Sequence, residues 1–389
     1  MAIATKRRIE YIDLLRGWAV IVMIQTHVFN ATLTGEITGS GFFEVIKFID
    51  GLVAPSFLFA SGLAYAVTTR RKIADYLSFG RPLFKQLWRL LLILLIGYTL
   101  HIPKFSYFHL RWVAGERAWQ VFFQVDVLHC IAVSLLFLQI LLLILRRENR
   151  LYTTLVGIVC AVLFATPVMW GIDFWTVMPV PVAEYMNGLH NSLFPLFPWS
   201  VFLFAGSITG WLYLKAKDRE GHGETKAVPS FMRSAAVFGA VLVVASFVLR
   251  PVESAVYPTY DYWRFSPSFV LLRIGLVLLL CAAMFAFERL KGVSPASVVT
   301  LIGRESLIVY VAHLTIVYGN FGRFNFHDRV GNAFGYPEAL LATLILMAMM
   351  YMLARVWSTI KTGPPGRKKG VQIAFALVLV GIFFTQPPT

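Results

Sequence analysis

The sequence predicts an all-α integral membrane protein, a polytopic helical bundle of about 11 transmembrane helices. Of its 389 residues, 58% are hydrophobic and 14% are charged, a ratio that water-soluble folds do not use. The apolar residues are gathered into runs of roughly 18 to 25, the length that a helix needs to cross a hydrocarbon core of about 30 Å. Length and apolar content therefore define the fold class.

The predicted spans leave little of the chain outside the membrane. Residues 1–318 are expected to form a transmembrane core, and residues 319–389 two further helices of the same domain. The longest connections, roughly 17 to 20 residues, are too short for a packed extramembrane domain. In chain order the expected spans are Tyr11–Asn30, Ile46–Thr69, Leu83–His101, Trp119–Leu145, Leu151–Trp170, Ser192–Leu214, Met232–Leu249, Pro267–Phe287, Val298–Tyr318, Tyr336–Trp357 and Val371–Thr385.

The loop charges predict the orientation of the chain. With the basic start Lys6-Arg7-Arg8 taken as cytoplasmic, alternate loops carry about 23 Lys and Arg on that side and about 8 on the other. We therefore expect the N-terminus inside and Thr389 outside. The net charge of +15 also favours anionic lipid headgroups. Nucleic-acid binding is not expected, because no basic domain with interleaved aromatic residues is present.

The three cysteines do not predict a disulfide or a metal cluster. Cys130, Cys160 and Cys281 each lie inside an apolar span, where a thiol behaves as a small hydrophobic group. A cleavable signal peptide is not expected either, since Asp13 and Arg16 interrupt the segment between the basic start and the apolar run. The first span is expected to remain in the protein.

The first span carries four polar residues on one helix face, namely Asp13, Arg16, His27 and Asn30. A charged group inside a span costs at least about 2.5 to 3.5 kcal/mol at the helix centre, so these side chains must face protein or water. His27 lies about 16 Å beyond Arg16 along the helix axis. A neutral imidazole suits general acid–base chemistry, and the alternative is a hydrogen-bonded packing histidine.

Two further spans carry ionisable residues. Asp126 and His129 lie three residues apart on one face of the fourth span, where the carboxylate would orient the imidazole and raise its basicity; a structural polar pair is the alternative. No third ligand follows at metal-site spacing, so zinc is not predicted. In the ninth span, Arg304 could hold a phosphate or carboxylate or pair with Glu305, and His313 lies further out.

A histidine also marks the mouth of the sixth span. His190 precedes Pro195 and Pro198, which are expected to distort the first helical turns, and distorted helix starts often line cavities. The alternative is an interfacial loop with an aromatic belt residue. Arg273 in the eighth span has no local partner in the sequence, and its role, in structure or in substrate binding, stays open.

These motifs resemble two related groups of membrane acyltransferases. Asp13-Leu-Leu-Arg16-Gly17, followed by His27, is similar to the opening of bacterial integral-membrane O-acetyltransferases that decorate envelope glycans. Four later motifs resemble more closely the bacterial members of the heparan-α-glucosaminide N-acetyltransferase family. These motifs are Ala54–Gly62, Phe84–Arg89, Phe194–Gly206 and Gly303–His313. Each motif alone is weakly specific. The order of the motifs, from Asp13 to about His313, is a much more specific signal.

The resemblance implies an acyltransferase core in a multi-pass protein of the bacterial cytoplasmic (inner) membrane. An acyl group, usually acetyl, would pass from cytosolic acyl-CoA to a hydroxyl or amine, often of a sugar, at the extracytoplasmic side. His27 matches the essential histidine of the first span in the O-acetyltransferases, and Asp13 and Arg16 match the motif near the CoA entrance. The family's lysosomal enzyme has its catalytic histidine just before the second span, but Phe43–Gly51 contains none here, so that role is not carried over.

These considerations predict the site residues and partners. The expected catalytic residues are His27, followed by Asp126 and His129; acyl-CoA is expected at Asp13, Arg16, Arg70, Arg71, Arg89 and Arg304, and the acceptor at Asn30, Asp50, His190 and His313. The expected partners are membrane lipid, acyl-CoA as donor substrate, a sugar or glycan acceptor and, optionally, further copies of the chain, with no metal and no nucleic acid.

A second function uses the same residues. In a proton-coupled transporter or exporter, Asp13, Asp126, His129 and His313 would relay protons or bind solute near the midplane. Acyl-CoA separates the two hypotheses, since a transporter should neither bind nor hydrolyse it. A purely structural subunit is disfavoured, because so many intramembrane ionisable groups are costly without a cavity to serve. Direct transfer and an acyl-histidine intermediate both remain open.

Overall fold

The computed structural model describes residues 9–294, 297–319, 325–364 and 366–387. Across these ranges the regular secondary structure is helical, with one isolated bridge between Leu33 and Phe334. The chain divides into two compact units. The first unit contains Met1–Val53, Leu100–Trp119 and Ala286–Thr389, and the second contains Ala54–Thr99 and Gln120–Phe285.

Each unit is built from segments that are distant in the sequence. The first unit holds α1 (Glu10–Thr32), α2 (Gly35–Thr38), α3 (Gly41–Asp50), η1 (Pro103–Phe105), α7 (Tyr107–Trp112), α16 (Val298–Arg304), α17 (Ser306–Tyr318), α18 (Phe326–Val330), α19 (Tyr336–Thr362) and α20 (Arg367–Thr385). The second holds α4 (Val53–Arg70), α5 (Ile73–Leu77), α6 (Arg81–Leu100), α9 (Val127–Leu145), α10 (Glu148–Trp170), η2 (Phe174–Thr176), α11 (Val180–Ala183), α12 (Leu196–Gly221), α13 (Ala227–Val256) and α14 (Tyr262–Phe265). Helices α8 (Glu116–Phe122) and α15 (Pro267–Lys291) contain residues of both units, and Val53 of α4 and Leu100 of α6 belong to the first.

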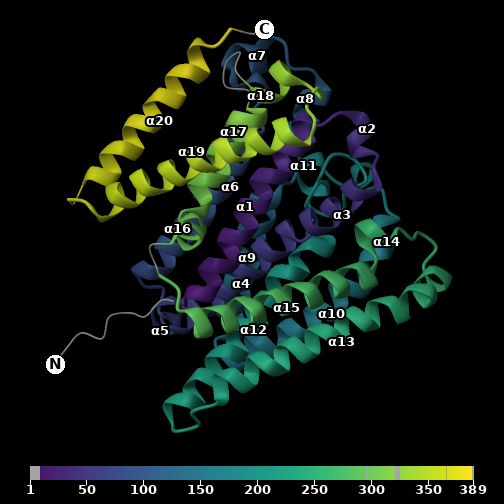
Figure 1. Cartoon of the computed structure of the whole chain (residues 1–389), viewed down its shortest axis with the longest axis vertical. Helices are drawn as coiled ribbons and strands as arrows, with labels where there is room; N and C mark the ends of the chain where they lie inside the picture. The colour runs from purple at the N-terminus through teal and green to yellow at the C-terminus, as the bar shows by residue number, and fades with distance from the viewer. Residues whose placement is uncertain (1–8, 295–296, 320–324, 365, 388–389) are drawn as a thin grey trace. The chain divides into compact units, whose positions relative to one another are not determined.

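Helix α1 is the central element of the first unit, where it packs on α16, α17 and α19 (Figure 1). Its closest approach is to α16. A Cβ added to Gly17 would collide with the carbonyl oxygen of Val299, and one added to Gly303 would collide with that of Asp13. Small residues at such positions let two membrane helices pack backbone to backbone. Gly17 and Gly303 therefore fix the position of α16 along α1.

Helices α16 and α17 form a bent pair, with an angle of 88° between them, at Glu305. The sequence predicted one continuous span here, with an ion pair between Arg304 and Glu305 as one possibility. Instead, the Glu305 carboxylate binds Lys361 of α19, whose Nζ lies 2.9 and 2.8 Å from its two oxygens. Glu305 is 6% exposed, so this ion pair compensates a nearly buried charge at the bend.

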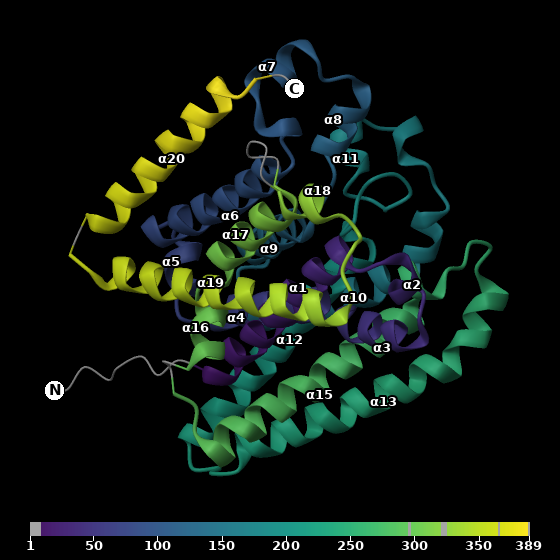
Figure 2. The same ribbon diagram turned by 45° about the horizontal axis from the view of Figure 1, so that its top comes forward.

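The C-terminal helices α19 and α20 form a hairpin at the edge of the first unit, as Figures 1 and 2 show. None of the most apolar stretch of α20 is buried against the rest of the chain. The helix is held mainly at its end, where Gln386 Nε2 donates to the Lys104 carbonyl at 2.6 Å and the Ser106 hydroxyl donates to the Gln386 carbonyl at 2.7 Å. A helix of this composition with exposed apolar faces is suited to contact with lipid.

The second unit is organised around α12, which packs on α9, α10 and α13. Glycines again mark the closest contacts: a Cβ on Gly206 would collide with the Phe59 carbonyl of α4. In both views α13 and α15 lie alongside one another, and Gly239 and Gly275 face each other there (Figures 1 and 2). Close helix packing through small residues thus recurs in both units.

The predicted fold class is confirmed, while two further expected spans change besides the one broken at Glu305. Nine described helices are long and apolar enough to cross a membrane, and the bent pair of α16 and α17 would make a tenth. The expected span Ile46–Thr69 is divided between α3 and α4, because the helix stops at Asp50 and Gly51. The expected span Trp119–Leu145 also shortens, since α9 begins at Val127.

Candidate functional site

Two histidines form the centre of the candidate site, which lies in the first unit. His27 is near the end of α1, and His313 is on α17. Their ring centroids are 5.3 Å apart, and the planes are inclined by 40°. The His313 side chain is completely buried, and His27 is partly buried. The structure thus brings together two residues that are separated by most of the chain, one predicted as catalytic and one as substrate-binding.

The hydrogen bonding of His313 fixes its tautomer. Its Nδ1 lies 2.8 Å from the carbonyl oxygen of Val309, one turn earlier on α17. Because a carbonyl oxygen only accepts, a neutral ring must carry its proton on Nδ1 and a lone pair on Nε2. Nε2 is buried and has no hydrogen-bond partner among the described residues. The interior of the unit therefore contains an unoccupied proton acceptor beside His27.

Two side chains from later in the chain support the end of α1. The Tyr318 hydroxyl donates to the His27 carbonyl oxygen at 3.0 Å, and its ring packs edge-on against the imidazole with centroids 5.5 Å apart. His327 Nδ1 lies 3.0 Å from the carbonyl oxygen of Ala31. The Ala31 carbonyl lies in the last turn of α1, where carbonyls lack helical partners, so His327 satisfies it. Together the two contacts hold the segment that presents His27. Neither contact could be predicted from the sequence.

Asp50 reaches the same part of α1 from the end of α3. Burial raises the pKa of its carboxyl from 3.8 to about 6, and the neighbouring Thr26 and Gln25 side chains lower it by less. Asp50 Oδ1 and Gln25 Nε2 are both buried, and the Gln25 side chain interacts with the Asp50 carboxyl. A buried acid and a buried amide therefore lie together beside the end of α1. Asn30, the predicted substrate residue on α1 itself, is exposed, unlike Asp50 Oδ1.

Replacing Asp50 by Asn should raise thermal stability at about pH 8 but not at about pH 4.5. The folded-state pKa of about 6 exceeds the unfolded value of 3.8, so the folded state binds more protons between these values. Stability of the wild type therefore falls as pH rises through this window, and the Asn variant avoids this loss. The measurement is the unfolding midpoint in detergent across this pH range. Glu44→Gln, on an exposed position of the same helix, is the control; a pH-independent difference between wild type and Asp50→Asn would contradict the prediction.

The predicted donor-binding residues of the first unit gather where α1 packs on α16. Asp13 is 8% exposed and Arg16 is partly buried, and both take part in polar or electrostatic interactions. The backbone of Asp13 lies against Gly303, the residue before Arg304, which is also partly buried. The sequence had placed these residues on two separate spans. The packing of α1 on α16 brings their backbones together.

Asp126 and His129 lie together in the second unit, as their spacing predicted. Their geometry is that of a helix cap: Asp126 Oδ1 accepts hydrogen bonds from the backbone N–H groups of Leu128 and His129, at 2.8 and 3.2 Å. His129 Nδ1 lies 2.9 Å from the same oxygen and 3.2 Å from the Asp126 backbone nitrogen. The His129 ring also packs edge-on against Tyr98, with centroids 4.3 Å apart. This arrangement favours the structural alternative for the pair.

Asp126→Ser should leave the protein folded and active, whereas Asp126→Ala should destabilise it by about 0.5 to 2 kcal/mol. Serine is also a good N-cap, so it keeps the start of α9 while removing the carboxylate beside His129. Unfolding midpoints and acyl-transfer rates of the two variants are compared with wild type. A serine variant that is stable but inactive would assign the carboxylate to the chemistry instead.

His190 lies in a loop between α11 and α12, on the surface of the second unit. Its Nε2 is 2.8 Å from Asp173 Oδ1, and its ring stacks on Trp175 with centroids 3.7 Å apart. The hydrogen bond from His190 lowers the pKa of Asp173. The sequence did not indicate Asp173 or Trp175, because both belong to an irregular loop in which no periodicity predicts contacts. As predicted, the α12 start is distorted, with Phe197 outside helical geometry.

The arginines predicted to bind the donor in the second unit differ in availability. Arg70 closes α4 and forms ion pairs with Asp218 of α12 and, at 3.9 Å, with Glu148 of α10. A phosphate would have to compete with these two carboxylates. Arg71 and Arg89 are exposed and have no ion pair among the described residues. They are the more accessible of the predicted phosphate contacts.

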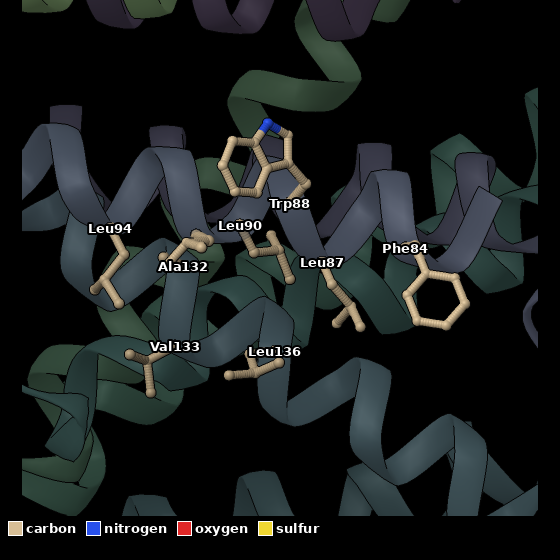
Figure 3. A pocket seen from close by; sticks show the side chains of 9 residues that line it. Phe84, Leu87, Trp88, Leu90, Leu94, Ala132, Val133 and Leu136 are labelled. Carbon is tan, nitrogen blue, oxygen red and sulfur yellow. The ribbon is translucent and has the colours of Figure 1, made fainter. Parts of the chain in front are cut away.

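An apolar groove of about 490 Å³ between α6 and α9 contains none of the predicted site residues (Figure 3). Phe84, Leu87 and Leu94 line it from α6, and Ala132 and Leu136 line it from α9. Its lining includes no titratable side chain, so the groove itself offers no acid or base. The described ranges contain no group of three or more His, Cys, Asp or Glu side chains that could hold a metal ion.

The fold and the site define a multi-pass helical membrane protein with paired histidines in its interior. A family model described as heparan-alpha-glucosaminide N-acetyltransferase, catalytic, matches residues 8–245, more than half of the chain. The chain therefore belongs to this family, which implies transferase activity. No curated protein matches the chain. The matched segment includes His27, Asp126 and His129, whereas Arg304 and His313 follow it.

Proposed function

We propose that the protein is a membrane-bound acyltransferase that moves an acetyl or other acyl group from cytosolic acyl-CoA to a hydroxyl or amine of a sugar-like acceptor. The acceptor is taken to bind at the extracytoplasmic side of a bacterial inner membrane, with the N-terminus in the cytoplasm. The family match supports the transferase class. The excess of Lys and Arg in alternate loops supports the orientation.

The observation that carries this proposal is the contact between His27 and His313. A packing histidine normally spends its ring nitrogens on hydrogen bonds, yet His313 Nε2 is buried with a free lone pair in the described structure. An orphaned polar atom of this kind calls for a ligand or a functional role. Placed beside a second imidazole, it supports a site at which protons are accepted and returned.

The chemistry assigned to His27 is general base and then general acid catalysis. As the acceptor oxygen or nitrogen attacks the thioester carbonyl carbon, His27 takes the proton that the acceptor loses. The carbon–sulfur bond then breaks, and His27 returns the proton to the CoA thiolate. The products are the acylated acceptor and CoA with a free thiol, so atoms and charge balance. His313 Nε2 would accept a hydrogen bond from the acceptor and hold it at His27.

The remaining predicted residues are assigned to binding. Asp50 and Gln25, which interact beside the end of α1, would hold hydroxyl or amine groups of the acceptor, and Asn30 and His190 are the other residues assigned to the acceptor from the sequence. Basic residues would bind the CoA phosphates, for which a guanidinium offers bidentate hydrogen bonds. The residues assigned to the donor are Asp13, Arg16, Arg70, Arg71, Arg89 and Arg304.

The proposal predicts that detergent-purified protein binds acetyl-CoA and releases CoA thiol when a glucosamine acceptor is added. Binding is measured by calorimetry, and thiol release by a chromogenic disulfide. The control is CoA without an acyl group, which should bind without releasing additional thiol. If neither acetyl-CoA nor longer acyl-CoA binds, the acyltransferase proposal is wrong, and the proton-coupled transporter becomes the better hypothesis.

A further inference from the structure

A groove between the end of α19 and the start of α20 is lined by both cationic and apolar side chains. Its volume is about 390 Å³, and it lies within the first unit. The lining residues are Met352, Arg355, Val356, Thr359 and Ile360 of α19 and Arg367 of α20. No carboxylate is among these described lining residues. A ligand that matches this lining has a negatively charged group next to an apolar part.

The two arginines of the groove are available to an anion. Both are exposed, and neither forms an ion pair with an acidic residue in the part of the chain that the structure describes. A Cβ added to Gly363 would lie 3.4 Å from Arg367 Nη1, so the Arg367 guanidinium folds back over the connection between the helices. The Arg355 guanidinium lies over the Tyr351 ring, 5.9 Å from its centroid. An aromatic face does not neutralise a guanidinium, so both positive charges remain to be balanced.

The position of the groove along the two helices is that of a lipid headgroup. Both α19 and α20 are long and apolar enough to cross a membrane. Arg367 is the first residue of α20, and Arg355 lies seven residues before the end of α19, about 10 Å along the axis. In the orientation proposed from the loop charges, this end is cytoplasmic. Basic pockets between membrane helices on that side are typical binding sites for anionic lipid headgroups.

Apolar surfaces continue from the groove along both helices. Met352 and Val356 are 58% and 55% exposed on α19, and none of the most apolar stretch of α20 is buried. In both views the two helices diverge from their connection (Figures 1 and 2). At its far end α20 is held by the hydrogen bonds of Gln386 to Lys104 and Ser106. Acyl chains that extend from a headgroup in the groove can therefore cover apolar side chains of both helices.

We propose that this groove binds an anionic phospholipid, with the headgroup phosphate between Arg355 and Arg367 and the acyl chains along the apolar sides of α19 and α20. The phosphate oxygens accept hydrogen bonds from both guanidiniums. Phosphatidylcholine also has a phosphate, but its positive choline group would lie close to the two arginines and weaken binding. The site contains none of the residues assigned to acyl transfer, so it does not rest on the proposed function.

Two double variants with the same loss of charge test the arginines. Arg355→Gln with Arg367→Gln removes the cations that line the groove, whereas Lys368→Gln with Lys369→Gln removes two exposed cations outside the lining. Native mass spectrometry of purified protein with equal phosphatidylglycerol and phosphatidylcholine measures the lipid preference. Wild type and the lysine variant should prefer phosphatidylglycerol, and the arginine variant should lose this preference by on the order of tenfold. An unchanged arginine variant, or an equal loss in both variants, would overturn the proposal.

An added carboxylate tests the groove by a second route. Thr359 and Thr362 are both exposed on α19, and each hydroxyl donates to the carbonyl four residues earlier at 3.0 Å, but only Thr359 lines the groove. Thr359→Glu should repel the phosphate and pair with the arginines, so it should lose the preference for phosphatidylglycerol. Thr362→Glu should keep most of it. Equal effects of the two substitutions would contradict a headgroup in the groove.

Photo-crosslinking on the wild-type protein tests the location without any substitution. Phosphatidylglycerol with a diazirine near the start of one acyl chain, or phosphatidylcholine with the same chain, is supplied in nanodiscs, and labelled peptides are mapped by mass spectrometry. Phosphatidylglycerol should label the peptides that contain Met352–Ile360 and the start of α20 several-fold more than phosphatidylcholine does. Equal labelling by the two lipids would overturn the proposal, and this result does not depend on the folding of a variant.

The same experiments separate a lipid from the other occupants of the groove. Excess glycerol phosphate or CoA should not reduce the labelling by phosphatidylglycerol. If either abolishes it, the groove is a site for soluble phosphates, and the lipid proposal is wrong. If native mass spectrometry shows a dimer without bound phosphatidylglycerol, and crosslinks join the α19 helices of two copies, a second copy of the chain occupies this face instead.

Discussion

Replacing His27 by alanine should reduce acyl transfer by about 10²- to 10⁴-fold, the contribution typical of a positioned acid–base group. Without the imidazole, no side chain at this position takes the proton from the acceptor as it attacks the thioester. Acyl-CoA affinity should change little, because the assigned phosphate contacts are arginines at other sites. The measurement is steady-state CoA release with acetyl-CoA and a glucosamine acceptor, combined with a direct binding isotherm.

Two further substitutions make the His27 result specific. His222→Ala removes an exposed histidine at the end of α12 and should keep full activity, which controls for a general loss of imidazole. His313→Ala should raise the KM for the acceptor more than it lowers kcat, because His313 is assigned to holding the acceptor. Full activity of folded His27→Ala would exclude His27 as the base and leave His129 as the next candidate.

The number and type of elements could be predicted from the sequence because spanning the membrane depends on run length and apolar content. Breaks within an apolar run were not predictable in the same way. The run around Asp50 and Gly51 reads as continuous by average hydropathy, yet the helix ends there. At Glu305 the pattern likewise predicts a straight helix. At this bend Glu305 forms an ion pair with Lys361, which is supplied by a different helix.

The site could be predicted one residue at a time, but its contacts could not. His27 and His313 each stand out as ionisable residues within apolar runs. Their contact results from the packing of α17 on α1, which no sequence spacing encodes. Contacts between residues that are close in the sequence could be predicted, and Asp126 and His129 do interact. Their cap geometry was missed because it depends on where α9 begins, and helix boundaries are the weakest part of a sequence prediction.

Gly303→Ala should strongly destabilise the first unit, by about 1 to 3 kcal/mol or more, the usual range for overpacking a tight contact. A Cβ at this position would collide with the carbonyl oxygen of Asp13, which belongs to the backbone of α1 and has no rotamer with which to move away. Helix propensity alone would favour alanine over glycine by roughly 0.8 to 1 kcal/mol. The clash must therefore cost more than the gain in helix propensity. A net loss of stability would show that the clash is present.

Gly157→Ala on α10 is the matched control for Gly303→Ala, because nothing lies within 4 Å of its added Cβ. It should be neutral or slightly stabilising in the same thermal unfolding assay in detergent. Because Gly303 fixes α16 against α1, folded Gly303→Ala protein should also lose acyl transfer while Gly157→Ala retains it. A Gly303→Ala variant as stable and active as wild type would show that α1 and α16 are not packed backbone to backbone, and that the position of His27 does not depend on this contact.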